Sequence, residues 1–226
     1  MKISLKQTGK RYNYEWIFRN LDFTFHAGNS YAILGANGSG KSTLLQIISG
    51  SIVPSAGEIN YSLTPNPSTK ERGTVSADSL DNFSEEKIIP SENIFRYLSI
   101  STPYLELPEE MTLTELLHFH SGFKKFRDNV SVKELIEISG LKKTSDAFIK
   151  NFSSGMKQRV KLLLAILSDT PLLLLDEPTT NLDEAGVQWW KNLMLTHTKN
   201  RLVIIASNME REYEQCEERL MIGDYK

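Results

Sequence analysis

Residues 35–43 read GANGSGKST and fit the pattern G-x-x-x-x-G-K-[ST]. The stretch follows a short apolar run, SYAIL at 30–34, and opens a segment with helical spacing at 41–50. Gly38 and Gly40 allow the backbone to curl so that its N–H groups point inward, and the positive end of the following helix acts at the same place. The pattern therefore predicts a phosphate-binding loop between a buried strand and a helix.

The residue types in this loop suit a nucleoside triphosphate bound with Mg²⁺. Lys41 is expected to reach the β and γ phosphates, and the Ser42 hydroxyl is a suitable Mg²⁺ ligand. The predicted binding set is Gly35, Asn37, Gly38, Ser39, Gly40, Lys41, Ser42 and Thr43. The alternative is a chance glycine-rich turn, which the flanking strand and helix argue against. We therefore expect ATP and Mg²⁺ as cofactors.

A second acidic motif, LLLLDEP at 172–178, reads as a buried strand that ends in two carboxylates. Asp176 is expected to face the loop and hold Mg²⁺ through water. Glu177 is expected to orient or deprotonate an attacking water. The alternative, that the strand ends in acids because the surface begins there, loses weight when a phosphate-binding loop precedes it.

The order of periodic segments predicts an α/β fold with a mostly parallel sheet. Residues 1–28 alternate and carry aromatics, which predicts two antiparallel strands at an edge. Strands are expected at 30–35, 57–63, 172–176 and 202–206, and helices at 41–50, 112–168 and 185–197. Residues 64–86 are polar with two prolines, which predicts an inserted loop. A neutral surface insertion is the main interpretation of this loop, and a cover or partner contact is the alternative.

The composition is that of a globular protein of 226 residues, 40% hydrophobic and 24% charged. A formal net charge of −2 gives no basic surplus, so we expect no nucleic acid partner. The single cysteine, Cys216, cannot form an internal disulfide, which fits a reducing compartment. Since the sequence has no apolar run of about 18 residues, no membrane span is expected. The basic cluster Lys124, Lys125 and Arg127 is interpreted as a solvated helix face, with contact to a membrane subunit as the alternative.

Two further stretches, NFSSGMKQR at 151–159 and TNLD at 180–183, complete a family pattern. Together with GANGSGKST and LLLLDEP, in this order, they resemble the ATP-binding subunit of an ABC transporter. The resemblance implies a P-loop NTPase core with an antiparallel β edge subdomain and an inserted helical subdomain. It implies one domain over 1–226, with the core at 1–103 and 166–226 and the helical part at about 104–165.

The resemblance also implies how the protein works. Two such subunits pair head to tail as a homodimer or with another ATPase subunit, and the signature motif of each closes over the ATP of the other. A separate membrane permease is the expected partner, which places the chain in the cytoplasm at the inner face of the membrane. The implied activity is ATP hydrolysis coupled to transport. Its implied catalytic residues are Glu177, Lys41 and, by position, Asn208.

Some residues of this chain match the positions of the family motifs, and others differ from them. Ser153 and Gly155 match the signature, whereas Ser154 and Met156 replace its first Gly and its Gln. A hydroxyl and free N–H groups at a helix start suit a γ-phosphate, although Ser153 also reads as an ordinary helix cap. Asp183 matches an acid of the family's next loop or caps the helix after it. Tyr12 matches the aromatic residue that stacks on adenine, or is an edge-strand aromatic.

Two departures affect the catalytic machinery. The strand LVIIAS at 202–207 is followed by Asn208, where the family has a His that contacts the γ-phosphate. An amide can donate to phosphate but carries no proton or charge near neutral pH, and the alternative is that Asn208 caps the next turn. The family's loop Gln is also missing, since no Gln occurs between Gln46 and Gln158. Residues 101–103, Ser-Thr-Pro, are expected around that position.

These departures leave a rival function open. A nucleotide-gated module would dimerise on ATP and hydrolyse it slowly or not at all. Lys41, Asp176 and Glu177 favour the enzyme. An ABC ATPase that works on ribosomes or DNA is disfavoured, because the chain has one nucleotide unit and no basic surplus.

Overall fold

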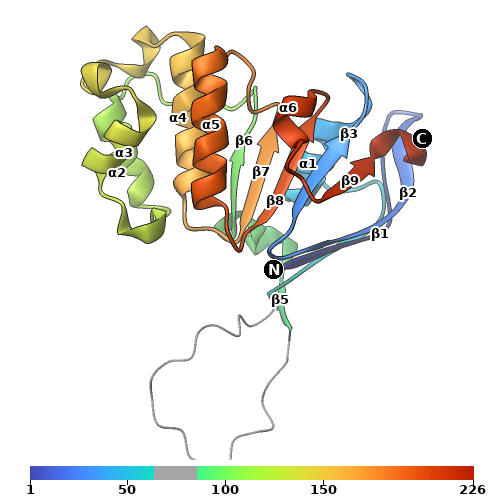
Figure 1. The fold of residues 1–226 in the computed structure, drawn as a ribbon. Coiled ribbons are helices and arrows are strands. Elements are labelled where there is room, and N and C mark those ends of the chain that lie inside the picture. Colours follow the sequence, from blue (N-terminus) through green and yellow to red (C-terminus); the bar gives the residue numbers. More distant parts are fainter. Residues whose placement is uncertain (64–85) are drawn as a thin grey trace, which may run out of the picture.

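The computed structural model describes residues 1–63 and 86–226. Its centre is a parallel sheet in the order β6-β7-β8-β3-β9 (Figure 1). The strands are β3 (Ser30–Leu34), β6 (Leu98–Ser101), β7 (Leu172–Asp176), β8 (Leu202–Ser207) and β9 (Glu218–Met221). Because the strands are parallel, their carboxyl ends lie at one edge of the sheet, which is where ligands bind in such folds. The glycine-rich loop at 35–43 and the acidic end of the motif at 172–178 both lie at this edge.

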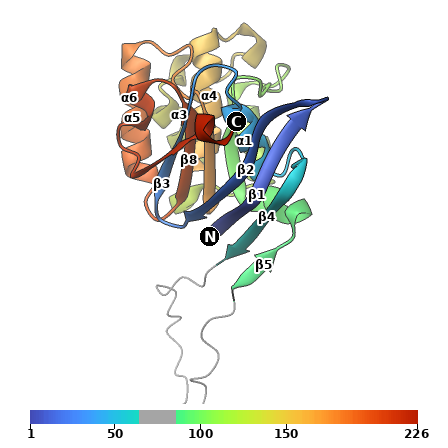
Figure 2. The ribbon, with the colours of Figure 1, turned by 90° about the vertical axis from the view of Figure 1, so that its right-hand side faces the viewer.

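An antiparallel sheet in the order β2-β1-β4-β5 lies beside the parallel one (Figure 2). Its strands are β1 (Lys2–Tyr12), β2 (Glu15–His26), β4 (Ala56–Leu63) and β5 (Lys87–Ile89). β1 and β2 form a hairpin in which Tyr12 pairs with Glu15, and Asn13 takes a positive φ of 54° in the turn. Asn tolerates that conformation better than most residues. The antiparallel edge predicted for residues 1–28 is confirmed.

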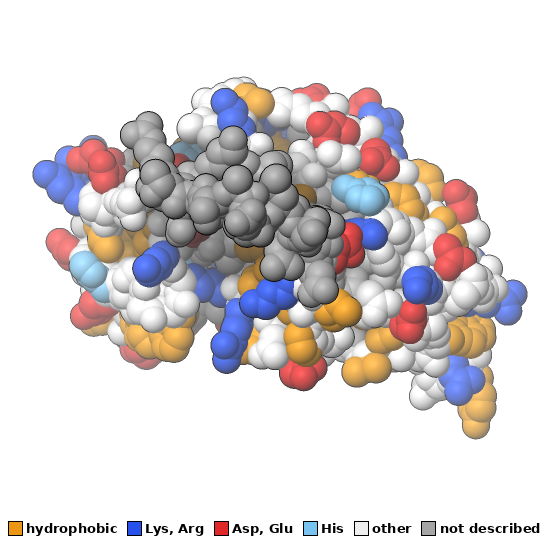
Figure 3. All heavy atoms as spheres, turned by 90° about the horizontal axis from the view of Figure 1, so that it is seen from below, with side chains coloured by type: hydrophobic (Ala, Val, Ile, Leu, Met, Phe, Trp, Pro, Cys, Tyr) orange, Lys and Arg blue, Asp and Glu red, His pale blue; other side chains and the backbone are white. Residues whose placement is uncertain are grey.

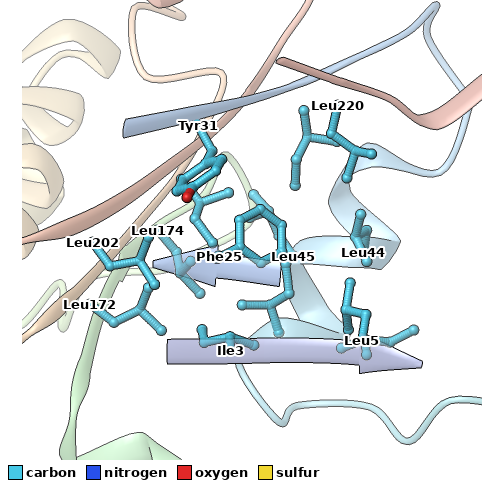
Figure 4. Close-up of a cluster of buried hydrophobic side chains, with 14 of the residues drawn as sticks. Ile3, Leu5, Phe25, Tyr31, Leu44, Leu45, Leu172, Leu174, Leu202 and Leu220 are labelled. Carbon is cyan, nitrogen blue, oxygen red and sulfur yellow. The ribbon is translucent and has the colours of Figure 1, made fainter. Parts of the chain in front are cut away.

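The parallel sheet is covered on both faces, which explains its continuous apolar strands. Alternate residues of β7 and β8 point to opposite faces. Leu172, Leu174 and Leu202 join a core with α1 (Lys41–Ile48) and the antiparallel sheet (Figure 4). Leu173, Leu175 and Val203 join a second core with α4 (Ser154–Leu167) and α5 (Glu184–His197). Figure 1 shows α4 and α5 side by side on that face.

The segment between β6 and α4 is helical. It contains α2 (Leu113–Ser121) and α3 (Val132–Ser139). Each begins with a reciprocal cap, formed by Thr112 with Glu115 and by Ser131 with Glu134, and Gly140 ends α3 in a left-handed conformation. Such caps satisfy N–H groups that have no partner inside the helix. The capping sequences therefore explain where these two helices begin.

Short elements complete the chain. Helix α6 (Glu210–Tyr213) follows β8. Short 3-10 helices lie at Ser91–Arg96, Arg127–Asn129, Lys142–Thr144, Ile149–Asn151 and Ile222–Tyr225. The predicted polar loop 64–86 lies outside the described residues apart from Glu86. The division into a core and a helical part at 104 and 165 stays a prediction, and α4 crosses the second boundary.

The surface carries mixed charge where it can be seen. On the visible part of the face in Figure 3, acidic and basic side chains are interspersed. Lys124 corrects the expectation of a solvated basic cluster, because it is only partly exposed and its ammonium donates to Leu98 O. Burial lowers the pKa of Lys124 below its usual value. Among the described helices, none has the length and apolarity to cross a membrane.

Candidate functional site

The loop after β3 is shaped by its glycines. Gly35, Gly38 and Gly40 have φ of 154°, 75° and 107°, and α1 begins directly after Gly40. A side chain at Gly35 would meet Ser39 Oγ at 2.5 Å, and one at Gly40 would meet the Ile17 side chain at 2.5 Å. The loop therefore fits between the two sheets only because these positions lack a Cβ.

Helix α1 differs from the other long helices in how it begins. The first N–H groups of α2, α3, α4 and α5 are capped by the side chains of Thr112, Ser131, Ser153 and Asp183. No side chain caps the start of α1 at Gly40. Uncapped N–H groups and the positive helix end together favour an anion at this point. The structure thus leaves the start of α1 available to phosphate.

Lys41 lies inside the curl of the loop. It is 5% exposed, and its ammonium donates to the carbonyl oxygens of Gly35 at 2.8 Å and Ala36 at 3.1 Å. A phosphate oxygen would be a stronger acceptor for this ammonium than a neutral carbonyl. The Lys41 ammonium lies at the uncapped start of α1. A phosphate oxygen bound there could therefore replace the two carbonyl oxygens as its acceptor.

The acids at the end of β7 face the same place. Glu177 lines a pocket of about 440 Å³ together with residues 37–43, Ile17 and Tyr104. Its backbone has a φ of 45°, which is unusual for a residue with a side chain, and its N–H donates to Ala206 O at 2.9 Å. Such strained positions concentrate at functional sites. Glu177 thus combines an unusual backbone conformation with a place in the wall of the pocket beside the phosphate-binding loop.

Asp176 is buried next to that loop. Burial raises its pKa above the usual range, and the Ser42 hydroxyl and Lys41 partly offset the shift. Its Oδ1 atom has no hydrogen-bond partner within the described residues. A buried carboxylate oxygen without a donor is a suitable ligand for a cation.

The Mg²⁺ that the sequence predicts as a cofactor fits these residues. Ser42 and Asp176 offer a hydroxyl and a carboxylate, the oxygen ligands that Mg²⁺ prefers. In the described ranges no group of three His, Cys, Asp or Glu residues is placed to hold a metal. The remaining Mg²⁺ ligands would therefore come from phosphate groups and water, as is usual for this ion.

Asn208 reaches the phosphate-binding loop. Its side-chain N–H donates to Asn37 Oδ1 at 2.9 Å. The contact follows from the sheet, because Leu34 pairs with Ser207 and the residues after both strands emerge side by side. Asn208 does not cap the next turn, since α6 has no side-chain cap and the Met209 N–H donates to Ser207 Oγ at 2.9 Å. The strand therefore ends in a side chain directed at the loop.

Ser153, Gly155 and Asp183 come together in a second hollow. It has a volume of about 360 Å³, includes Asn181, and shares no lining residue with the pocket beside Lys41. Ser153 Oγ accepts from the Met156 N–H at 3.2 Å, and Asp183 Oδ1 accepts from the Gly186 N–H at 2.8 Å. Both residues are thus helix caps, yet the Ser153 hydroxyl keeps its proton free for donation. Within one chain the signature residues do not reach the phosphate pocket.

Tyr12 and residues 101–103, which are predicted to contribute to the site, lie outside the lining of the phosphate pocket. Tyr12 is 49% exposed at the end of β1, has the Lys10 ammonium 5.4 Å from its ring, and does not line the phosphate pocket. Ser101 is buried, and Lys161 donates to Pro103 O at 3.0 Å. The side chain from this connection that lines the pocket is Tyr104, one residue beyond the predicted three. The sequence pattern does not indicate Tyr104, because a tyrosine shares neither the amide group nor the position expected for the missing Gln.

Two buried residues that link the motifs were also missed. Gln158, in α4, donates to Pro178 O at 2.8 Å and so ties the signature helix to the loop after Glu177. Glu212 is 3% exposed and accepts from the Thr179 N–H at 2.7 Å, from the Thr179 hydroxyl and from the Ser207 hydroxyl. It therefore connects the ends of β7 and β8 behind the site.

A phosphate-binding loop follows the central parallel strand β3, and an acid pair ends β7, which is separated from β3 by β8 alone. This arrangement defines a P-loop nucleotide-binding protein. The family model described as ABC transporter matches residues 18–180, which is more than half of the chain. The chain belongs to the ABC transporter family, as an ATP-binding domain.

Known proteins agree with this assignment. The Nod factor export ATP-binding protein I of Burkholderia lata is 28% identical over 97% of this chain, and that of Rhizobium meliloti is 29% identical over 97%. The chain spans 67% and 61% of these two relatives. A dimeric ATP-binding cassette in a post-hydrolysis state, bound to ADP and phosphate, has the same fold with a TM-score of 0.72, 21% identity, and coverage of 98% of this chain and 95% of that one.

Proposed function

We propose that this chain hydrolyses ATP with Mg²⁺ and that two chains pair head to tail to do so. The observation that carries the proposal is that Lys41, the uncapped start of α1 and Glu177 lie at one edge of the sheet. Phosphoryl transfer depends mainly on positioning and charge neutralisation, which these groups supply.

The chain's residues have distinct parts in the reaction. Lys41 and the N–H groups of the loop hold the β and γ phosphates. Ser42 and Asp176 would hold Mg²⁺, which neutralises charge on the phosphates when bound. A water oxygen bonds to the γ phosphorus while the bond to the bridging oxygen of ADP breaks, and Glu177 orients the water and accepts its proton. Asn208 supports the loop through Asn37.

A second chain completes the site in this proposal. Ser153 and Gly155 lie in a hollow separate from the phosphate pocket, so they can meet a γ-phosphate only on another chain. The Ser153 hydroxyl and the start of α4 suit that contact. Asp183, beside them, would lie at the contact between the chains, and Tyr12 would stack on the adenine. The similar cassette bound to ADP and phosphate is dimeric, which supports the pairing.

A membrane permease is the proposed partner, since the similar relatives are export ATP-binding proteins. A cavity of about 280 Å³ between β6, α2 and α4 offers it a docking place. Leu105, Phe119 and Phe123 line this cavity, and the rings of Phe119 and Phe123 pack edge to face at 5.0 Å. Exposed aromatic side chains in an apolar groove are typical contact residues. Binding there would hold the chain at the cytoplasmic side of the membrane.

Steady-state phosphate release with Mg-ATP tests the enzymatic proposal. We expect turnover by the chain and its loss, by about 100-fold or more, in Lys41→Ala and Glu177→Gln. Glu177→Gln should still bind ATP, whereas Lys41→Ala should bind it weakly. A Glu177→Gln variant that hydrolyses ATP at the parent's rate would refute the role of Glu177.

The rival function is a nucleotide-gated module that binds ATP and dimerises without appreciable hydrolysis. Asn208 and Tyr104 favour it, because neither side chain matches the family's His or Gln. Tight ATP binding without phosphate release, with the permease present, would establish the module. A rise in turnover in Asn208→His would show that the missing imidazole limits the enzyme.

A further inference from the structure

Tyr104 is a side chain in the wall of the phosphate pocket to which the proposed reaction assigns no part. It lines the pocket together with Glu177 and residues 37–43 of the phosphate-binding loop. The residue is 84% exposed, so both its ring and its hydroxyl are accessible to a ligand in the pocket. A phenol combines a flat apolar body with a hydrogen-bond donor at its end. Tyr104 therefore has the position and the chemistry to contact a bound phosphate group.

A proline turn presents this side chain. Directly after β6, residues 102–105 form a turn in which the Leu105 N–H donates to Thr102 O at 3.2 Å. Pro103 occupies the second position of the turn, where its fixed φ is favourable, and Tyr104 occupies the third. The proline reduces the number of conformations open to this segment. The backbone that carries Tyr104 is therefore restrained before a ligand binds.

Helix α4 holds this turn through Lys161. The Lys161 ammonium donates to Pro103 O at 3.0 Å. This oxygen belongs to the peptide group that joins Pro103 to Tyr104, so the hydrogen bond acts on the backbone of Tyr104 itself. Lys157, one turn earlier on the same helix, pairs with Glu109 instead. Lys161 is therefore a positioning residue for Tyr104.

The order of the strands indicates which end of the nucleotide Tyr104 meets. β6 and β7 are neighbours, and both lie on the same side of β3 in the sheet. Tyr104 and Glu177 follow these two strands, so they approach the phosphate-binding loop from that side. Tyr12, on the antiparallel sheet, does not line the pocket. Since Glu177 is assigned to the water that attacks the γ phosphorus, Tyr104 lies toward the γ-phosphate and away from the base.

We propose that the Tyr104 hydroxyl donates a hydrogen bond to a γ-phosphate oxygen and so distinguishes a nucleoside triphosphate from a diphosphate. The choice of the γ-phosphate rests on the proposed function. A neutral donor suits a place beside the Glu177 carboxylate, where a second acid would repel the phosphate. Hydrogen bonds to an ionised acceptor are stronger than those between neutral groups. Tyr104 thus supplies a contact that ATP makes and ADP does not.

Calorimetric titration with Mg-ATP and with Mg-ADP tests this contact. The chain carries Ser153→Arg in these titrations, so that pairing and hydrolysis do not contribute to the measured affinity. Tyr104→Phe should weaken binding of Mg-ATP about tenfold and binding of Mg-ADP less than about twofold. Tyr14→Phe is the matched control, because Tyr14 is an exposed tyrosine between β1 and β2 that does not line the pocket. It should leave both affinities within about twofold of the parent.

The same titrations test the positioning role of Lys161. Lys161→Met keeps the apolar stem and removes the ammonium, and it should lower the preference for Mg-ATP over Mg-ADP about threefold. Lys161→Arg, which keeps a donor on a long stem, should restore the preference. Lys157→Met is the control on the same helix and should leave the preference unchanged. A Lys161→Met variant that weakens both nucleotides alike would show a merely structural role.

Two results would overturn the contact. They are unchanged affinities in Tyr104→Phe, and an equal loss of affinity for Mg-ATP and Mg-ADP. Absence of binding by both nucleotides would reject the contact together with the nucleotide site. Phosphate release by the parent chain, with an unchanged preference in Tyr104→Phe, would reject the contact and leave hydrolysis standing. A parent chain that releases no phosphate, but whose preference for Mg-ATP depends on Tyr104, would refute hydrolysis and leave the contact standing.

Discussion

At the residue scale, Asn208 shows how a substitution within a family pattern can keep a contact and change its chemistry. An imidazole at this position would carry a proton, whereas the amide links the end of β8 to Asn37 by a hydrogen bond of 2.9 Å. This hydrogen bond therefore holds the phosphate-binding loop from the end of β8, the strand that follows the acid pair in the sequence. We interpret Asn208 as a positioning residue for the phosphate-binding loop.

Removing either amide should therefore impair the same step. We expect Asn208→Ala and Asn37→Ala each to lower kcat about tenfold with KM for ATP changed less than about threefold. Because both variants lose one shared contact, the double variant should be no worse than about twice the single ones. The measurement is phosphate release over a range of ATP concentrations. Fully multiplicative effects would show that the two side chains act separately.

At the element scale, Glu212 joins two strand ends through a buried carboxylate. Its oxygens accept from Thr179 and from Ser207, so the loop after Glu177 and the strand before Asn208 are fastened to one side chain. Losing the carboxylate would leave buried donors without partners, which costs about 1–3 kcal/mol for each group.

Glu212→Ala should lower the free energy of unfolding by about 2–4 kcal/mol and kcat by more than tenfold. Ser207→Ala removes one donor to Glu212 and the acceptor of the Met209 N–H, and it should cost about 1–2 kcal/mol with a smaller loss of kcat. Urea denaturation and phosphate release measure the two effects. Glu210→Ala, an exposed residue on the same short helix, is the control and should leave both unchanged. A Glu212→Ala variant as stable and active as the parent would show that the Glu212 carboxylate does not hold the ends of β7 and β8 together.

Helix α2 carries a pH-sensitive contact. His120 Nε2 lies 2.8 Å from Ser168 Oγ, its ring stacks on Phe126, and burial together with Lys124 lowers its pKa to about 4. In the unfolded chain its pKa is about 6.5. Between these values the unfolded chain binds the proton first, so stability is full above pH 6.5 and falls as pH drops toward 4.

The loss attributable to His120 should reach about 1–3 kcal/mol at pH 4. Urea denaturation of the parent and of His120→Gln at pH 7, 6, 5 and 4 isolates it, because other titrating groups are common to both. The stability difference between the two should shrink or reverse as the pH falls. His118→Gln, at an exposed position of the same helix, is the control. A difference that does not depend on pH would mean that His120 titrates normally in the folded chain.

At the scale of the whole molecule, the separation of the two hollows requires a second chain. We expect Glu177→Gln with Mg-ATP to form a stable dimer, because ATP stays uncleaved between the chains. Lys41→Ala should stay monomeric under the same conditions, since it holds the phosphates weakly. Light scattering coupled to size exclusion measures the mass of each. A Glu177→Gln variant that binds ATP and remains a monomer would contradict the pairing.

Much of this architecture is predictable from the sequence, and the exceptions have physical reasons. The runs SYAIL and LLLLD are continuous and apolar, so their central strands and the motifs at their ends could be placed in advance. The contact between Asn37 and Asn208 depends on the pairing of Leu34 with Ser207, which local patterns do not specify. Glu212 lies on α6, whose four residues are too few to show helical periodicity.

Prediction of the candidate site from the sequence has the same limit. Lys41, Asp176 and Glu177 belong to motifs with fixed spacing, whereas Tyr104 enters the pocket through an irregular connection after β6. The path of such a connection is set by packing that the sequence pattern does not display. The roles of Tyr12, Ser153 and Asp183 depend on ligand and partner, and they remain proposals.

The most direct test of the central claim, an ATP site completed by a second chain, is phosphate release from a mixture of two inactive variants. Lys41→Ala keeps the signature residues, and Ser153→Arg keeps the phosphate-binding loop. Each alone should be inactive, and their mixture should regain partial turnover, because a mixed dimer contains one intact loop facing one intact signature. A mixture as inactive as its components, from variants that are folded and form mixed dimers, would contradict the account.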